Sequence, residues 1–102
     1  MLELGGKIEE HLHFLNPEER DTRKALITLL RREYRRKLAH YENLDQSFQK
    51  KYGVSFEEFE EKNVVKKKGF SWEVESDAMA WEQAVDGIKT MRTRLEDLDV
   101  LE

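Results

Sequence analysis

The sequence predicts an all-α protein organised as a long antiparallel helical hairpin, coiled-coil-like, with short N-terminal and connecting helices. Residues 17–52 contain no Gly or Pro after the initial Pro17. Within this stretch and within 72–98, apolar residues repeat every seven positions, which is the spacing of one helix face. Charged residues make up 39% and hydrophobic residues 38% of the 102 residues. This composition favours a single helical domain, 1–102, with most of its surface exposed to solvent, over a compact globular domain with a large core.

The first element is a short amphipathic helix at about 7–15. Ile8, Leu12 and Leu15 keep helical spacing, and the charged residues between them fall on other faces. This spacing predicts that the short helix packs one apolar side against the longer helix that follows.

The second element is the long helix, predicted at 17–52. Asn16 can cap it, Pro17 suits the first helical position, and Gly53 can end it in the left-handed conformation. At 1.5 Å per residue such a helix is roughly 54 Å long, so we expect the rest of the chain to lie along it. Its seam repeats every seven residues: Ile27, Tyr34, Tyr41 and Phe48.

The chain then reverses through a short connection. Ser55 and Glu58 have the spacing of a capping box, which predicts a helix at about 56–62. Within the following residues 63–69, Val64-Val65 are expected to form a brief extended stretch.

The last helix is predicted at 72–98, capped by Ser71 or Ser76. Its seam also repeats every seven residues. The two seams can be aligned antiparallel, which predicts these neighbours: Val74 near Phe48, Trp81 near Tyr41, Ile88 near Tyr34, and Leu95 near Ile27. Gly87 lies inside this helix at a cost of about 1 kcal/mol relative to Ala, and at the contact edge it would allow close helix approach.

Charge is distributed unevenly along the chain. Residues 20–51 carry ten Lys and Arg against four acids, net +6, while residues 73–102 carry three against nine, net −6. Either the acidic helix neutralises the basic one, or the basic segment meets nucleic acid or an acidic partner. For the second alternative, a nucleic-acid-binding regulator, the candidate face is the densest basic cluster: Arg31, Arg32, Arg35, Arg36 and Lys37.

Three large apolar residues lie outside the seam of the last helix. Trp72 and Met79 point roughly 140–160° away from the Val74/Trp81 stripe, and Phe70 directly precedes them. They either cover the apolar residues of the short helix at 56–62 or face a partner. Aromatic residues buried in an interface are its usual energetic centres, so Phe70, Trp72 and Met79 are the candidate partner-binding residues.

Several functional classes find no support in the residues. The chain has no cysteine, which removes thiol nucleophiles, disulfides and Cys-based metal sites. His11 and His13 are two apart, a spacing unlike the i, i+4 metal pairs of helices. No catalytic constellation, phosphate loop, cofactor site, membrane span or secretory signal is recognisable, so we expect a non-enzymatic cytoplasmic protein.

The stretch KKYGVSFEEFEEKNVV and the later FSWEVESDAMAWEQAVDGIKTM carry a family resemblance. Over about residues 30–98 the chain resembles small helical antitoxin-like proteins of bacterial and archaeal toxin–antitoxin gene pairs. The resemblance implies a protein that binds and neutralises a toxin-like partner encoded beside it. A homodimer is expected on other grounds, because a small elongated helical chain with wide apolar stripes often needs a second copy of itself to bury enough surface. Such families often carry a DNA-binding part, and none is evident in this sequence.

Overall fold

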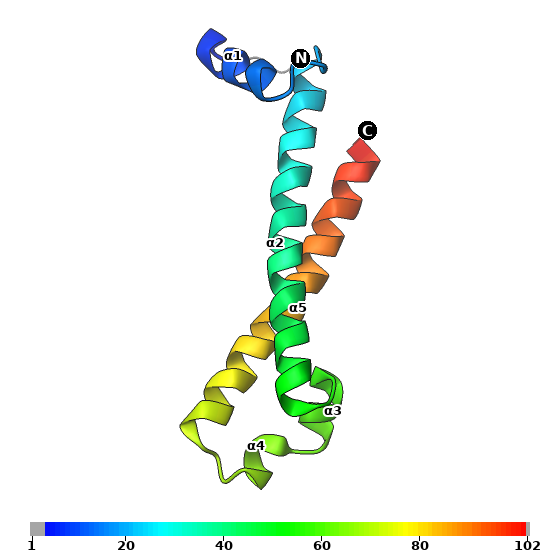
Figure 1. Cartoon of the computed structure of the whole chain (residues 1–102). Coiled ribbons are helices and arrows are strands. Elements are labelled where there is room, and N and C mark those ends of the chain that lie inside the picture. Colours follow the sequence, from blue (N-terminus) through cyan, green and yellow to red (C-terminus); the bar gives the residue numbers. More distant parts are fainter. Residues whose placement is uncertain (1–3, 102) are drawn as a thin grey trace.

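A computed structural model describes residues 4–101, and within that range it contains helices and no strands (Figure 1). The helices are α1 Gly6–Leu15, α2 Thr22–Tyr52, α3 Phe56–Glu61, α4 Val64–Lys67 and α5 Trp72–Leu101. The molecule is elongated, with extents of 59 × 24 × 19 Å. The all-α class expected from the sequence is therefore confirmed.

The two long helices, α2 and α5, run in opposite directions and cross each other (Figure 1). At one end Arg31 of α2 pairs with Asp99 of α5 at 3.1 Å, and at the other Lys51 pairs with Asp77 at 2.6 Å. The short helix α1 lies across the beginning of α2, while α3 and α4 lie at the opposite end of the molecule. One end of the α2–α5 pair thus carries α1, and the other end carries α3 and α4.

The predicted start of the long helix at 17 is wrong, because α2 begins at Thr22. The carboxylate of Asp21 accepts hydrogen bonds from the backbone N–H groups of Arg23 and Lys24, at 2.9 and 3.3 Å. These bonds satisfy two of the donors that a helix start leaves unpaired. Pro17 instead lies in a turn closed by a bond from the Glu19 N–H to the Asn16 carbonyl, which lets α1 fold across α2.

The other predicted boundaries agree more closely with the structure. Helix α1 starts one residue before the predicted position, α3 stops one residue earlier, and α5 continues three residues further. Gly53 has the expected left-handed backbone, with φ of 70°. Ser55 Oγ accepts from the Glu58 N–H at 3.2 Å, and Ser71 Oγ accepts from the Val74 N–H at 3.3 Å, so both serines act as caps.

The extended stretch expected at Val64-Val65 is also wrong. Both residues belong to the short helix α4, which follows Asn63 in a left-handed conformation with φ of 52°. Asn tolerates this backbone better than most residues. The abrupt turn at Asn63 allows both valine side chains to pack against the core cluster, an arrangement that an extended strand would not give.

The predicted register between the two long helices is wrong by one heptad. Trp81 was expected beside Tyr41, but its ring stacks on Phe48 with centroids 5.6 Å apart, and it also contacts Tyr52 at 5.9 Å. A seven-residue repeat matches itself equally well after a shift of seven residues, so the seam pattern alone does not distinguish the two alignments. The aromatic residues beyond the seam decide between them.

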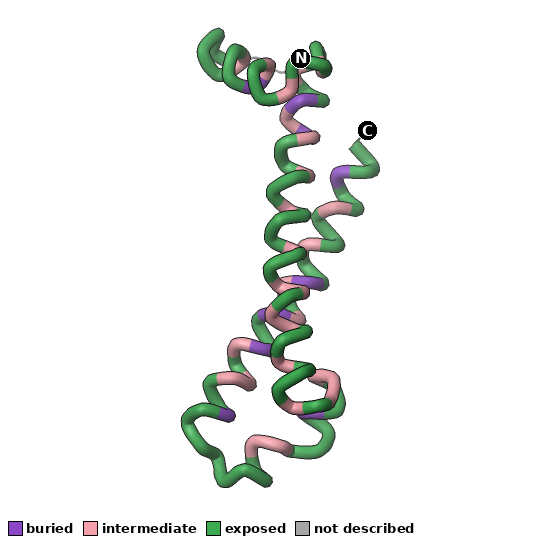
Figure 2. The backbone as a smooth tube through the Cα atoms, in the orientation of Figure 1, coloured by how far each residue is buried: buried purple, intermediate pink, exposed green. Residues whose placement is uncertain are grey.

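These aromatic residues form the main core cluster around Trp81, which is fully buried. Phe56 and Phe59 of α3 lie 5.4 and 5.0 Å from the Trp81 ring, in tilted or edge-on orientations that aromatic pairs prefer. The Trp81 indole N–H donates to Asp45 Oδ1 at 2.8 Å, so its polar group is satisfied. Elsewhere the buried positions form a thin line along the α2–α5 contact and under α1 (Figure 2).

A polar cluster ties α2 to the beginning of α5. Lys51 contacts Glu73 at 2.7 Å and Asp77 at 2.6 Å, and the Tyr52 hydroxyl donates to Asp77 at 2.6 Å. Burial, together with the hydrogen bond to Asp77, raises the pKa of Tyr52 to about 12. Hydrogen bonds to Asp77 and Glu73 also raise the pKa of Lys51. Burial of Asp77 opposes its ionisation, but the bonds from Lys51 and Tyr52 outweigh it and lower its pKa.

The raised pKa of Tyr52 predicts a loss of stability in alkaline solution. The folded state holds the phenolic proton more tightly than the unfolded state does, so this contribution is complete below pH 10 and disappears as the pH rises toward 12. We expect the urea midpoint to fall between pH 10 and 11, and to fall less steeply in Tyr52→Phe, which has no phenolic proton to lose. Equal slopes for the two proteins would contradict this role of Tyr52.

Candidate protein-interaction site

The three apolar residues singled out in the sequence are exposed. Trp72 is 82% exposed, Met79 71% and Phe70 58%. Phe59, which they were alternatively expected to cover, is buried by Tyr52 and Trp81 instead. Trp72 and Met79 are seven residues apart on α5, hence on nearly the same side of the helix and about 10 Å apart along its axis.

The turn before α5 fixes the position of Phe70. Gly69 and Phe70 both have left-handed backbones, with φ of 71° and 54°. This conformation is costly for a bulky side chain, by an amount on the order of 1–3 kcal/mol. The Phe70 N–H donates to the Val65 carbonyl at 2.9 Å, and this bond helps to hold the turn. The fold thus keeps a large apolar side chain exposed on a strained backbone.

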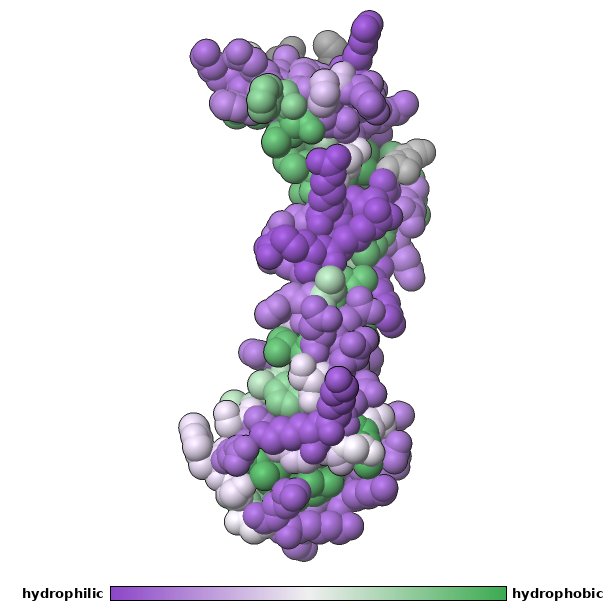
Figure 3. All heavy atoms as spheres, viewed as in Figure 1, coloured by the Kyte–Doolittle hydropathy of each residue, from purple (hydrophilic) through white to green (hydrophobic). Residues whose placement is uncertain are grey.

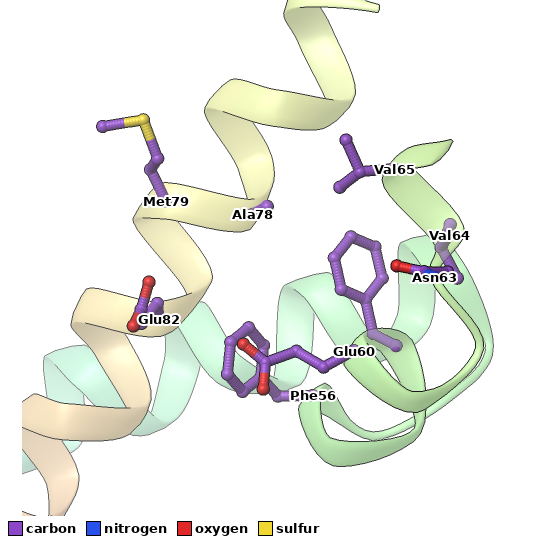
Figure 4. A pocket seen from close by; sticks show the side chains of 9 residues that line it. Phe56, Glu60, Asn63, Val64, Val65, Ala78, Met79 and Glu82 are labelled. Atoms are coloured by element: carbon purple, nitrogen blue, oxygen red, sulfur yellow. The ribbon is translucent and has the colours of Figure 1, made fainter. Parts of the chain in front are cut away.

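Met79 also lies at the rim of a cavity of about 340 Å³ between α3, α4 and α5 (Figure 4). Figure 4 shows the Phe56 ring between α3 and α5, with Glu60 reaching from α3 toward α5, while the sulfur of Met79 points away from Val65. Both apolar and polar side chains line the cavity. Its lining residues are Phe56, Phe59, Glu60, Asn63, Val64, Val65, Ala78, Met79 and Glu82.

The structure therefore brings only one of the three candidate residues, Met79, to the cavity. Sequence reasoning missed the cavity because its walls come from three successive helices, α3, α4 and α5, whose relative placement periodicity does not give. The heptad analysis did place Met79 off the seam, and the apolar pairs Phe56/Phe59 and Val64/Val65 were visible in the sequence. The heptad pattern did not determine the register between the long helices, and this register brings α5 opposite α3.

A second apolar surface lies at the α1 end of the molecule and was not anticipated. Figure 3 shows apolar atoms gathered over α1 and the adjacent part of α2. Phe14 is 84% and Val100 86% exposed. The exposed large apolar residues of α1 and the neighbouring ends of α2 and α5 are Ile8, Phe14, Leu15, Leu29, Leu30, Val100 and Leu101. Phe14 lies off the Ile8/Leu12/Leu15 face, a signal that the sequence contained.

The basic cluster of α2 divides into paired and unpaired residues. Arg31 pairs with Asp99 of α5, and its side chain is mostly buried. Arg36 pairs with Glu33 on its own helix at 2.6 Å, and this hydrogen bond lowers the pKa of Glu33. The remaining members, Arg32, Arg35 and Lys37, are exposed and form no ion pair within residues 4–101. The acidic helix thus neutralises part of the cluster only.

Across residues 4–101, no three His, Asp or Glu side chains lie close enough to hold a metal ion. His13 contacts the Glu19 carbonyl through Nδ1 at 3.1 Å, a bond that joins α1 to the turn before α2. Among the described helices, none is both long and apolar enough to cross a bilayer.

Comparisons with protein-family models, with curated proteins and with solved structures find no match for this chain. Its function is therefore inferred from its own residues and surfaces.

Proposed function

We propose that this chain is a non-enzymatic protein-interaction module that binds a protein partner through the exposed residues Phe70, Trp72 and Met79. The specific role proposed is antitoxin-like: the chain binds and neutralises a protein encoded beside it. Its framework in this proposal is a coiled-coil-like antiparallel hairpin of α2 and α5, with the binding surface at the end that carries α3 and α4.

The observation that supports this proposal most strongly is the exposure of Trp72, at 82%. Large aromatic side chains are the usual anchors of protein interfaces, and exposed apolar patches often mark such sites. Met79 connects this surface to the cavity between α3 and α5. The strained turn at Phe70 adds a second reason, because a bulky residue in a left-handed backbone is retained where a function requires its position.

A homodimer is proposed as the state of the free protein, formed through the apolar surface at the α1 end. Residues such as Phe14 and Val100 are the most exposed large apolar residues of the described chain. In a two-fold dimer the same patch of both copies meets, so one apolar surface per chain is enough to form the interface. The two apolar surfaces lie at opposite ends of the molecule, so one chain could use both together.

A nucleic-acid-binding regulator is the second candidate function, because Arg32, Arg35 and Lys37 remain exposed without ion pairs among the described residues. Contacts of these side chains with phosphates would release counterions, so binding would weaken steeply with salt. Replacing Arg32 and Arg35 with Glu would abolish such binding. Salt-insensitive binding, or none at low salt, would eliminate this candidate.

The partner-binding proposal is tested by co-expressing the chain with the protein encoded beside it. A tag on one protein should capture the other, and light scattering of the eluate should give a complex of defined mass. We expect Trp72→Ala/Met79→Ala to weaken the complex at least about tenfold, as the removal of interface anchors does.

Phe14→Ala is the matched control for that variant. Phe14 is as exposed as Trp72 but lies at the other end of the molecule, so its removal should leave partner capture intact and reduce only self-association. Capture that survives the double substitution at Trp72 and Met79, or a partner that is never captured, would contradict the proposed function.

A further inference from the structure

The cavity beside Met79 continues into a second hollow along α5. This second hollow has a volume of about 480 Å³, and Phe56, Glu60 and Glu82 line both. The two hollows together form a groove between α3 and α5 that follows α5 from Met79 to Lys89. The ten residue steps between them correspond to about 15 Å of helix, or nearly three turns.

The floor of this groove is apolar. Phe56 lies between the two helices (Figure 4), with Ala78 and Val85 of α5 along the other side. All three residues are only partly buried, so each retains surface that a ligand can cover. An apolar floor nearly three helical turns long fits the apolar side of one amphipathic helix.

Both walls of the groove are acidic. Glu57 and Glu60 rise from α3, and Glu82 and Asp86 rise from α5. All four side chains are exposed, and within residues 4–101 none of them forms an ion pair or a side-chain hydrogen bond. Lys89 is the one basic residue that lines the groove, at its far end. The walls thus present four carboxylates to whatever occupies the groove, without neutralisation by the rest of the fold.

We propose that this groove binds a basic amphipathic helix of the protein partner. The apolar residues of that helix pack on Phe56 and Val85, and its Lys and Arg residues lie against the carboxylates on both walls. The inference rests on the proposed function, because it assigns the partner's chemistry at the cavity next to Met79. Charge complementarity is its basis: an apolar ligand without basic residues would bury the wall carboxylates unpaired, and an acidic ligand would be repelled.

The occupant is tested with two synthetic peptides of about 14 residues. One is an amphipathic helix of Leu and Lys, and the other has the same Leu positions with Glu in place of Lys. The chain carries ¹³C-labelled methionine methyl groups, so Met79 reports the groove while the partly buried Met91 serves as an internal reference. We expect the Lys peptide to shift Met79 and to bind at least about tenfold more tightly than the Glu peptide.

Matched variants separate the groove from general attraction to an acidic protein. Glu60→Gln/Glu82→Gln should weaken binding of the Lys peptide at least about threefold, because one charge is removed from each wall. Glu96→Gln/Asp97→Asn removes the same charge from exposed positions of α5 that do not line the groove, and it should leave binding unchanged. Equal loss in both variants would show general attraction only and would overturn the proposal.

Failure of this inference can be told apart from failure of the proposed function. Equal affinity for the two peptides, shifts at Met91 but not at Met79, or no binding would overturn the basic-helix assignment even if the neighbouring protein is captured through Trp72. Selective binding of the Lys peptide at Met79, with no capture of that neighbour, would support the groove assignment while the proposed partner is wrong.

Discussion

Replacing Trp81 with alanine is expected to lower the free energy of unfolding by about 3–5 kcal/mol, the range typical for truncating a buried Phe or Trp. Trp81 is fully buried and contacts Phe48, Tyr52, Phe56 and Phe59. Its removal leaves a cavity where α2, α3 and α5 meet. Because domains of this size are stable by only about 5–15 kcal/mol, much of the stability should be lost.

The second tryptophan of the chain provides the control for this prediction. Trp72→Ala deletes the same side chain from a site that is 82% exposed, so the urea midpoint should change little, by the equivalent of about 0.5 kcal/mol or less. Both variants can be followed by circular dichroism during urea unfolding. A similar loss in the two variants would mean that the aromatic cluster does not hold the α3 end together.

Replacing Gly87 with valine is expected to lower the free energy of unfolding by about 2–3 kcal/mol. A Cβ built at Gly87 would lie 2.6 Å from Cδ2 and Cε2 of Tyr41 and 2.7 Å from its Cγ. Since Cγ is the base of the ring, rotation of the ring tip alone does not relieve the clash. The absence of a side chain at Gly87 therefore sets how closely α2 and α5 approach.

Two further variants isolate that contact. Gln83→Val introduces the same residue at an exposed position of α5 and should change stability by about 0.5 kcal/mol or less. In a Tyr41→Ala background, Gly87→Val should cost clearly less than in the wild type, because the clashing ring is gone. Additive costs in this double-mutant cycle would show that the two residues do not constrain each other.

The parts of the fold that depend on local chemistry could be predicted from the sequence. Gly53 ends α2, and Ser55 and Ser71 cap the helices that follow, because a cap depends only on residues within one turn. The start of α2 was missed because Asn16 and Asp21 are both good caps five residues apart. The choice between them depends on α1, which needs a turn before it can fold back over α2.

The relative placement of the long helices could not be predicted from their periodicity. Seven-residue repeats leave alternatives that differ by whole heptads, and the predicted pairing of Trp81 with Tyr41 was one of them. The observed pairing with Phe48 places Trp81 against the aromatic residues of α3 as well. It also places Gly87, the one position of α5 without a side chain, against Tyr41.

The groove between α3 and α5 depends on that register, so it could not be predicted from the sequence either. In the sequence, Glu57 and Glu60 belong to one helix and Glu82 and Asp86 to another, and nothing in the helical periodicity relates the two pairs. Only the fold places the two pairs on facing walls above Phe56. The exposure of Trp72 and Met79 could be predicted without the tertiary structure, because their angular positions around the helix already separate them from the apolar seam.

The central claim, that the exposed apolar surface at the α3 end binds the protein encoded beside this chain, is tested most directly at Trp72. The chain can be labelled with 5-fluorotryptophan, which gives separate ¹⁹F signals for exposed Trp72 and buried Trp81. On addition of the neighbouring protein, the Trp72 signal should shift and lose its sensitivity to exchange of H₂O for D₂O, while Trp81 keeps its position. A complex in which Trp72 remains as sensitive to solvent as in the free chain would contradict the account.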